Sequence, residues 1–268
     1  MNKLQSRVLN IMKFFHQFCI ENDIQYFIMS GTMLGAIRHN GFIPWDDDID
    51  VGMTQENYEK LIALADEFNN SQSDFTLMLP GTKNYAYNFI KILDNNSTLI
   101  DHYKVKKMAL GFYIDVFEFC GIPSDKKKAL EVIKKRNILC QLRGCAMSFR
   151  SIGSRRYWPF YFIGKIIGIN RLLKKIKKID SKFPYSKHEY VYDPDGRNPR
   201  GIIPKTYIED GVELFTFEDA KFFGLKRYHE YLSSVYGDYM TLPNETQRYG
   251  HEFSFIDYNL SYQEYRKR

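Results

Sequence analysis

A short acidic segment, WDDDIDV at residues 45–51, has the residue types and spacing of a metal site. Alternate side chains of a β-strand share a face, so Asp48 and Asp50 are expected to project together, and Asp46 continues the row if the strand begins that early. Carboxylates held this close repel each other, and a shared divalent cation removes the repulsion. Hard oxygen ligands suit Mg²⁺, with Mn²⁺ as an alternative. The segment therefore predicts a cation site with Asp48 and Asp50 as ligands.

An exposed acidic loop is the competing interpretation, because runs of aspartate usually occupy loops. The neighbours of this run are apolar, however, with Phe42, Ile43 and Trp45 before it and Ile49 and Val51 inside it. This apolar surrounding favours a metal site beside a buried strand over a solvated loop.

Asp115 is the expected third ligand. It interrupts residues 112–119, FYIDVFEF, which are rich in aromatic and β-branched residues and form the clearest predicted strand of the chain. A lone aspartate in such a strand is costly to bury unless a ligand or a partner satisfies it. Taken alone, Asp115 would more often be satisfied by an arginine or by backbone amides. The acidic pair earlier in the chain makes a shared cation the preferred interpretation, and Glu118, on the opposite face, is not expected to join.

A small-residue turn, Gly31-Thr32, precedes the acidic segment. Such a turn, followed by an Asp-x-Asp strand and a later strand with one aspartate, resembles the polymerase-β-like nucleotidyltransferase superfold. The resemblance implies that backbone amides of the turn bind a phosphate, while the three carboxylates hold one or two metal ions. The arrangement suits phosphoryl transfer, in which catalysis consists of positioning and charge neutralisation.

Three basic positions accompany these acids. Arg38 and His39 lie between the turn and the acidic segment. Arg38 is expected to bind phosphate, whereas for His39 a phosphate contact and a surface position on a short helix are equally compatible. Lys91 falls in an apolar predicted strand, where a lysine requires a partner. Phosphate would supply that partner, and so would an ion pair with Asp94 or Asp115.

The longest motif, SGTMLGAIRHNGFIPWDDDIDVGM at residues 30–53, resembles the signature of the LicD family, a group related to fukutin-related protein. The likeness continues in Lys91-Ile92, in Gly111–Phe117, in Tyr236–Pro243, and in Arg248 and His251. The middle of the chain, roughly residues 125–200, is not diagnostic of the family. The resemblance adds Arg248 and His251 as contacts of the donor or the acceptor.

The LicD resemblance implies the metal-dependent transfer of a phosphocholine-like group from a CDP-activated alcohol to a hydroxyl of a cell-envelope glycan. Teichoic acid, lipopolysaccharide and capsule, free or lipid-linked, are the acceptors it implies, and Mg²⁺ is the implied cofactor. One carboxylate, Asp46 or Asp48, is expected to accept the hydroxyl proton. Two alternatives remain: a nucleotidyltransferase that leaves a nucleoside monophosphate on its target, and a non-catalytic protein that binds glycan or cation. The complete carboxylate set argues against the non-catalytic alternative.

The composition restricts the class of protein further. The net charge of +6 is compatible with anionic substrates, and motifs typical of nucleic-acid binding are absent from the sequence, so no nucleic-acid partner is expected. The four cysteines form no CxxC pair, which favours free thiols in a reducing compartment. The start of the chain lacks the pattern of a signal peptide, and no apolar run reaches the length of a membrane span. A cytoplasmic protein is expected.

The elements that must position these residues follow from periodicity. The predicted helices cover about residues 1–20, 54–69 and 123–147, with a short one near residue 31 and another before residue 236. The predicted strands lie at 26–29, 49–51, 75–79, 88–92 and 112–119, and residues 184–205 are expected to be largely loop. The expected class is α/β or α+β: a polymerase-β-like core with a small mixed sheet, and a mainly helical C-terminal part. We divide the chain into a catalytic core, residues 1–122, and a helical and loop region, residues 123–268, that completes the substrate site.

Residues 157–178 combine an apolar, aromatic stretch with a cluster of lysines. Such a segment could lie at the inner surface of a membrane, bound to anionic lipid. A buried helix with a solvated end explains the same pattern and is the preferred interpretation here.

Overall fold

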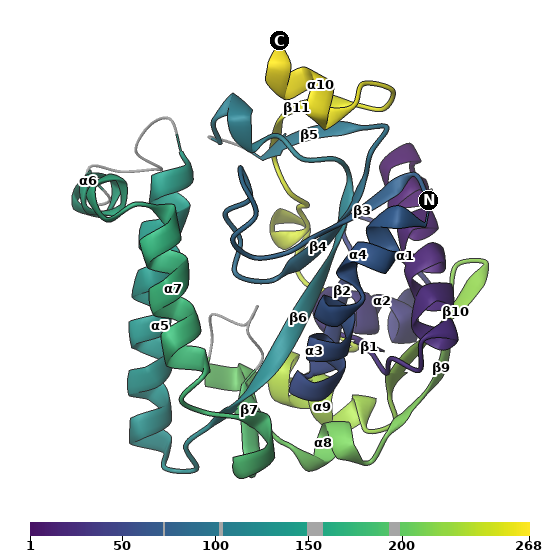
Figure 1. Ribbon diagram of the computed structural model, residues 1–268. Helices are drawn as coiled ribbons and strands as arrows, with labels where there is room; N and C mark the ends of the chain where they lie inside the picture. Colours follow the sequence, from purple (N-terminus) through teal and green to yellow (C-terminus); the bar gives the residue numbers. More distant parts are fainter. Residues whose placement is uncertain (72, 102–103, 149–157, 193–198) are drawn as a thin grey trace.

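The structure is a computed structural model that describes residues 1–268 except 72, 102–103, 149–157 and 193–198 (Figure 1). The helices are α1 (Lys3–Glu21), α2 (Ser30–His39), α3 (Gln55–Ala63), α4 (Ala65–Asn70), α5 (Lys126–Met147), α6 (Trp158–Ile167), α7 (Ile169–Asp180), α8 (Thr206–Glu209), α9 (Tyr228–Tyr236) and α10 (Tyr262–Lys267). The strands are β1 (Phe27–Ile28), β2 (Asp50–Thr54), β3 (Phe75–Met78), β4 (Ile90–Asp94), β5 (Thr98–Asp101), β6 (Tyr113–Ile122), β7 (Tyr190–Tyr192), β8 (Ile202–Pro204), β9 (Val212–Phe217), β10 (Ala220–Leu225) and β11 (Phe253–Asp257).

A mixed sheet forms the centre of the molecule. Its main path runs β3-β4-β6-β2-β1-β10-β9, and β7 and β8 extend it from the far end of β6. Two neighbouring pairs, β2 with β6 and β1 with β10, are parallel, and the other pairs along the path are antiparallel. The expected α+β class is therefore confirmed. Strands β5 and β11 form a second, two-stranded sheet.

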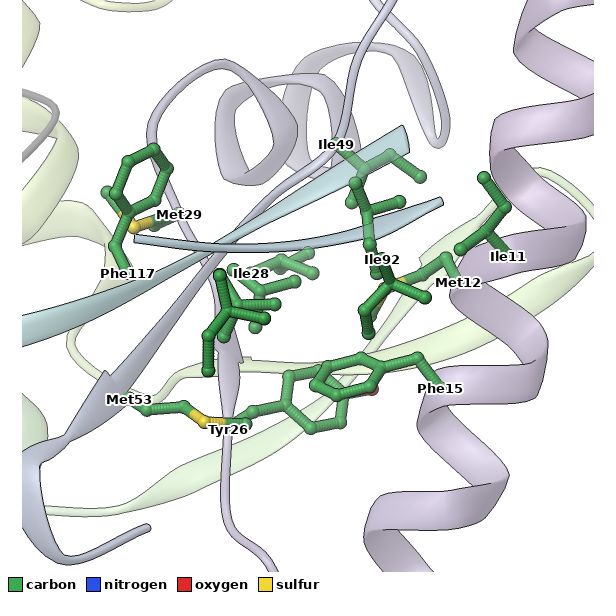
Figure 2. Close-up of a cluster of buried hydrophobic side chains, with 14 of the residues drawn as sticks. Ile11, Met12, Phe15, Tyr26, Ile28, Met29, Ile49, Met53, Ile92 and Phe117 are labelled. Atoms are coloured by element: carbon green, nitrogen blue, oxygen red, sulfur yellow. The ribbon is translucent and has the colours of Figure 1, made fainter. Parts of the chain in front are cut away.

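Helix α1 covers one face of the main sheet because it has a continuous apolar stripe. Figure 2 shows Ile11, Met12 and Phe15 of α1 facing Ile92, whereas Phe117 lies on the other side of the strands. All five side chains are buried. Side chains alternate along a strand. Lys91, next to Ile92, and Asp115, two residues before Phe117, therefore point away from α1. That second face of the sheet holds the candidate site.

The elements expected in the first half of the chain are present with small shifts. The predicted first helix corresponds to α1, the clearest predicted strand to β6, and the helix expected over 54–69 to α3 and α4, which divide at Leu64. The Gly31-Thr32 turn is the first turn of α2, which begins at Ser30. Strand β5 was not predicted.

Helix and loop dominate the described part of the second half, as expected, but this part also contains short strands that were not predicted. Strands β9 and β10 form a hairpin that extends the main sheet, and β7 and β8 lie within the segment expected to be loop. The hairpin turn, Glu218-Asp219, lacks the glycine or asparagine that usually marks such turns. Glu218 takes a left-handed φ of 56°, and its carboxylate accepts a hydrogen bond from the Phe42 amide at 3.0 Å. A contact with a distant segment thus stabilises this turn.

Helices α5, α6 and α7 form a separate layer at the left of Figure 1. Helix α5 packs against both α6 and α7, and an ion pair between Arg136 and Asp180, at 2.9 Å, joins the middle of α5 to the end of α7. In the part of the chain that the structure describes, every helix is too short or too polar to cross a lipid bilayer. The division of the chain at residues 122 and 123 stays a prediction, although strands from both parts belong to the main sheet.

Candidate active site

Three aspartates from two strand ends converge on the face of the sheet away from α1. Asp50 is the first residue of β2, and the parallel register places it directly opposite Asp115 of β6. Asp48 lies two residues before Asp50, in the segment that leads into β2. Each of the three offers a carboxylate oxygen within 4.8 Å of the others. Asp115 is buried, while Asp48 and Asp50 are half-buried, so the group is open on the side of the leading segment.

Backbone hydrogen bonds fix the position of these carboxylates. The amide of Asp50 donates to the Thr32 hydroxyl at 2.8 Å, and the Asp50 carbonyl accepts from the Met29 amide at 3.0 Å. The amide of Asp115 donates to the Ile49 carbonyl at 2.9 Å. Thr32, which the sequence suggested as part of a phosphate-binding turn, therefore uses its side chain to hold the start of β2.

Lys91 is the buried counter-ion of this group. Its register partner across β4 and β6 is Asp115, and its ammonium forms an ion pair with the Asp115 carboxylate. The ammonium also lies 3.2 Å from the ring centre of Tyr113, 4.7 Å from Tyr87 and 5.3 Å from Phe89. Of the partners considered from the sequence, the structure selects Asp115 and surrounds the cation with aromatic rings.

Burial and mutual repulsion destabilise the ionised carboxylates of the acidic group. Burial and the nearby charge of Asp46 raise the pKa of Asp48 to about 7. Burial also raises the pKa of Asp46 above the usual value for an aspartate. Such shifts mean that the ionised carboxylates are destabilised by one another and by the loss of water. Three fixed carboxylate oxygens are a donor set that suits a hard divalent cation, which would stabilise the ionised forms.

Asp46 lies beside the first turn of α2 instead of continuing the row of β2. A Cβ atom built on Gly31 would come within 2.7 Å of the Asp46 carboxylate, so a glycine at this position permits the close approach. The Asp46 carboxylate accepts a hydrogen bond from the Asp47 amide at 3.2 Å and interacts with Asp48. Asp46 is thus close to the three carboxylates without sharing their arrangement in the sheet.

The C-terminal part of the chain returns to the acidic segment. The Nδ1 of His251 lies 2.6 Å from Asp47 and 3.7 Å from Asp48, and the His251 amide donates to Asp47 at 2.9 Å. A Cβ on Gly250 would meet the Trp45 carbonyl at 2.6 Å, so glycine is required for this approach. The contact was not predictable from local sequence, since it joins residues 204 positions apart.

His251 has a second geometric role. Together with Asp47 and Asp48 it forms another group whose ligand atoms lie within 4.8 Å of one another. The hydrogen bond to Asp47 and the charge of Asp48 raise the pKa of His251 to about 9. A protonated imidazole has no free lone pair for a metal. At neutral pH the three aspartates are therefore the better cation site, and His251 acts as a cation beside them.

Arg38, His39 and Arg248 gather at the other end of α2. Arg38 donates to the Tyr239 carbonyl and to His39 Nε2, each at 3.0 Å. The Arg248 guanidinium lies 5.3 Å from the ring centre of Trp45. Burial of Arg38 lowers the pKa of Arg38, and the nearby positive charge of Arg248 lowers it further. Seven residues of helix, about 10 Å of rise, separate Arg38 from the first turn. The predicted phosphate contacts thus fall into two places, one at each end of α2.

Arg143 of α5 was not singled out from the sequence. Its guanidinium lies 5.6 Å from the ring centre of Tyr87 and donates a hydrogen bond to Asn88. Its buried Nε has no hydrogen-bond partner among the described residues, and burial lowers the pKa of the group. No local pattern marks this residue, because its burial depends on how α5 meets the segment before β4.

Comparison with known proteins agrees with this geometry. Residues 23–137 match the model of a family described as "LicD/FKTN/FKRP, nucleotidyltransferase domain". The chain is 28% identical over 249 residues to the lipopolysaccharide cholinephosphotransferase LicD of Haemophilus influenzae, an alignment that covers 91% of this chain and 92% of that protein.

Two shorter matches are with uncharacterized proteins of Rickettsia. The protein of Rickettsia prowazekii is 45% identical over 58 residues, which is 22% of each chain. The protein of Rickettsia typhi is 51% identical over 47 residues, 18% of this chain and 15% of that one. The resemblance read from the sequence is confirmed, since residues 23–137 match the LicD/FKTN/FKRP nucleotidyltransferase domain and the similarity to a LicD protein extends over nearly the whole chain.

Proposed function

We propose that this protein transfers a phosphocholine-like group from a CDP-activated alcohol to a hydroxyl of a cell-envelope glycan. The observation that supports it most strongly is the convergence of Asp48, Asp50 and Asp115 at the ends of two parallel strands. The nearly full-length similarity to a lipopolysaccharide cholinephosphotransferase supports the transferred group and the class of acceptor. Lipopolysaccharide, teichoic acid and capsule, free or lipid-linked, are the acceptors that fit this proposal.

Asp48, Asp50 and Asp115 would hold Mg²⁺, or Mn²⁺ in its place. When bound, the cation supplies positive charge against the phosphate oxygens of the donor. Lys91 compensates part of the negative charge of Asp115. One lysine beside three carboxylates leaves the site negatively charged, so it can still bind a divalent cation. The rigid backbone around Asp50 and Asp115 keeps the oxygens in place before substrate binds.

In the proposed reaction, the acceptor hydroxyl oxygen forms a bond to the phosphorus nearest the alcohol. The bond from that phosphorus to the bridging oxygen breaks, and CMP leaves with the bonding electron pair. The hydroxyl proton passes to a carboxylate, for which Asp46 and Asp48 are the candidates. Asp46 is preferred, because it lies next to the three carboxylates without being one of the proposed ligands, and burial raises its pKa above the usual value for an aspartate.

The two ends of α2 would hold different parts of the donor. The first turn of the helix, with Gly31 and Thr32, presents backbone amides and the positive end of the helix dipole to a phosphate. Arg38 and Arg248 lie at the other end, beside Trp45, where they can contact the remainder of the nucleotide. His251 adds positive charge on the open side of the acidic group.

The test is the fate of a doubly labelled donor. CDP-choline labelled separately in cytidine and in choline is incubated with a cell-envelope glycan and Mg²⁺. Release of labelled CMP, with choline on the glycan, is the expected result. Cytidine label on the glycan with free choline phosphate would establish the nucleotidyltransferase alternative, and binding of glycan or cation without any product would favour the non-catalytic one.

A further inference from the structure

Helix α6 exposes an apolar face to solvent. Trp158, Phe162, Ile163 and Ile166 are 49%, 51%, 47% and 79% exposed. At 100° per residue these positions occupy one arc of the helix, about 140° wide. Two of the rings, those of Trp158 and Phe162, also contact each other with centroids 5.5 Å apart. Large apolar side chains rarely gather on an exposed helix face unless that face binds something.

The opposite side of α6 is the side that packs on the protein. Gly164 is buried, and a Cβ atom there would lie 2.3 Å from the Leu142 carbonyl of α5. This close contact fixes the rotation of α6 and directs its apolar arc away from α5. Figure 1 shows α6 at the outer edge of the helical layer, distant from the central sheet. The preferred interpretation from the sequence, a buried helix, is therefore wrong for α6.

The segment that forms α6 and α7 is rich in basic residues. Residues 158–179 contain Lys165, Arg171, Lys174, Lys175, Lys177 and Lys178, and no aspartate or glutamate. The apolar residues Leu172, Leu173 and Ile176 of α7 are buried, so the lysines of α7 lie on its solvent side.

A groove of about 570 Å³ beside the junction of α6 and α7 extends the positive surface. Lys83 and Lys107 line it together with Arg171. The charge of this region is complementary to an anionic surface and unfavourable to a cationic one.

We propose that the exposed face of α6, with the lysines of α7, docks the protein on the surface of an anionic phospholipid bilayer. Trp158 and Phe162 would enter the interface, where aromatic side chains prefer to lie. The lysines would contact phosphate headgroups. A helix of 10 residues is about 15 Å long, half the thickness of a hydrocarbon core, so α6 lies along the surface.

A second copy of this chain is a less suitable occupant of the same face. A symmetric dimer through α6 places the same patch of both subunits together. The basic residues of the two α6–α7 segments would then face each other, and like charges across an interface oppose association. A bilayer with anionic headgroups binds the apolar residues and the lysines at once.

Binding to vesicles tests this proposal and needs no turnover, so its outcome is independent of the proposed reaction. The chain has two tryptophans, and Trp45→Phe leaves Trp158 as the single reporter. With phosphatidylglycerol-containing vesicles its emission should shift to the blue and the protein should co-sediment, while pure phosphatidylcholine should give neither. Phe162→Ser with Ile166→Ser should weaken binding at least tenfold, and Lys174→Glu with Lys178→Glu should weaken it further at low salt.

Leu214→Ser is the matched control, since Leu214 is an exposed apolar residue, 51% accessible, on β9. It should bind vesicles like the unmodified protein. Equal binding to neutral and anionic vesicles, or full binding by the Phe162→Ser, Ile166→Ser protein, would overturn the proposal. Dimerisation in sedimentation velocity without lipid, abolished by those two substitutions, would also overturn it and assign the face to a second copy.

Discussion

Strand β6 has two buried or half-buried acids, Asp115 and Glu118, whose surroundings differ in charge balance. At Asp115, the neighbouring acidic segment contributes several more carboxylates, against which the described residues place Lys91 and His251. Glu118 lies three residues further along β6, on the opposite face. The charged groups near it are two acids, Asp180 and Glu59, and two bases, Arg136 and Lys177.

The difference separates a cluster that we propose binds a further cation from one in which acidic and basic groups of the chain pair with each other. Around Glu118, Arg136 forms an ion pair with Asp180 that links α5 to α7, and basic and acidic groups are comparable in number. Around Asp115, the described acidic groups outnumber the described basic ones, and the carboxylate oxygens of Asp48, Asp50 and Asp115 lie within 4.8 Å of one another. We therefore expect substitutions at the first cluster to change stability and substitutions at the second to change catalysis.

Asp48→Asn should have the largest effect. It removes a proposed cation ligand, so turnover should fall on the order of 10³-fold or more. The melting temperature without metal should be unchanged or higher, because the substitution removes a destabilised charge. Steady-state kinetics measures the turnover, and calorimetry on the same protein measures the melting temperature.

Glu118→Gln is the matched control, because it also replaces a carboxylate by its amide, in the strand β6 that pairs with β2. It should keep normal turnover. Near-normal turnover by Asp48→Asn, or loss of turnover in Glu118→Gln, would remove the distinction between the two clusters.

Arg136→Met should have the largest effect on stability. It leaves Asp180 without its ion-pair partner where α5 meets α7, and breaking a mostly buried pair in this way costs about 2–4 kcal/mol. Denaturant unfolding measures the loss, and turnover of the folded fraction should be retained. A loss of turnover with unchanged unfolding would show that this cluster belongs to the active site.

Arg38→Ala tests whether the basic group at the far end of α2 contributes to the reaction. Removing a cation that is proposed to contact the nucleotide of the donor should lower turnover by roughly 10–1,000-fold. Because Arg38 also donates to the Tyr239 carbonyl, Arg38→Lys is the matched variant that keeps the charge. If the lysine variant and the alanine variant lose equal activity with equal loss of stability, the role of Arg38 is structural.

Glu118→Gln should have the smallest effect, and it depends on pH. Burial and the charge of Asp180 raise the pKa of Glu118 to about 7 from an ordinary value near 4.5. The folded protein then binds more protons than the unfolded chain between these values, so the glutamate makes the protein less stable as pH rises from 4.5 through 7. The glutamine variant should match the unmodified protein near pH 4 and exceed it by about 1–3 kcal/mol at pH 8. Equal stability of the two proteins at pH 8 would contradict this.

The acidic motif could be predicted because its information is local. Asp48 and Asp50 are two positions apart, and their spacing alone places them on one side of an extended segment. Asp115 could be added because an aspartate in an apolar strand is unusual wherever it occurs. The register that places Asp115 between Asp50 and Lys91 could not be predicted, since it depends on which strands pair.

The contacts that complete the site depend on long-range packing. His251 contacts Asp47, which lies 204 positions earlier in the chain. Only the family resemblance suggested His251 as a site residue. The β9–β10 hairpin was missed because its turn contains Glu218, whose left-handed conformation is stabilised by a contact to Phe42. The exposure of α6 likewise depends on Gly164, which fixes the rotation of the helix on α5.

The most direct test of the central claim is CMP release from CDP-choline in the presence of a glycan acceptor, titrated with Mg²⁺ in the unmodified protein and in Asp50→Asn. The unmodified protein should release CMP with a saturable dependence on Mg²⁺ and stop when the metal is chelated. Asp50→Asn should stay folded and release no CMP at any Mg²⁺ concentration. CMP release that persists after chelation, or that Asp50→Asn supports at the normal rate, would contradict a cation-dependent transferase site at Asp48, Asp50 and Asp115.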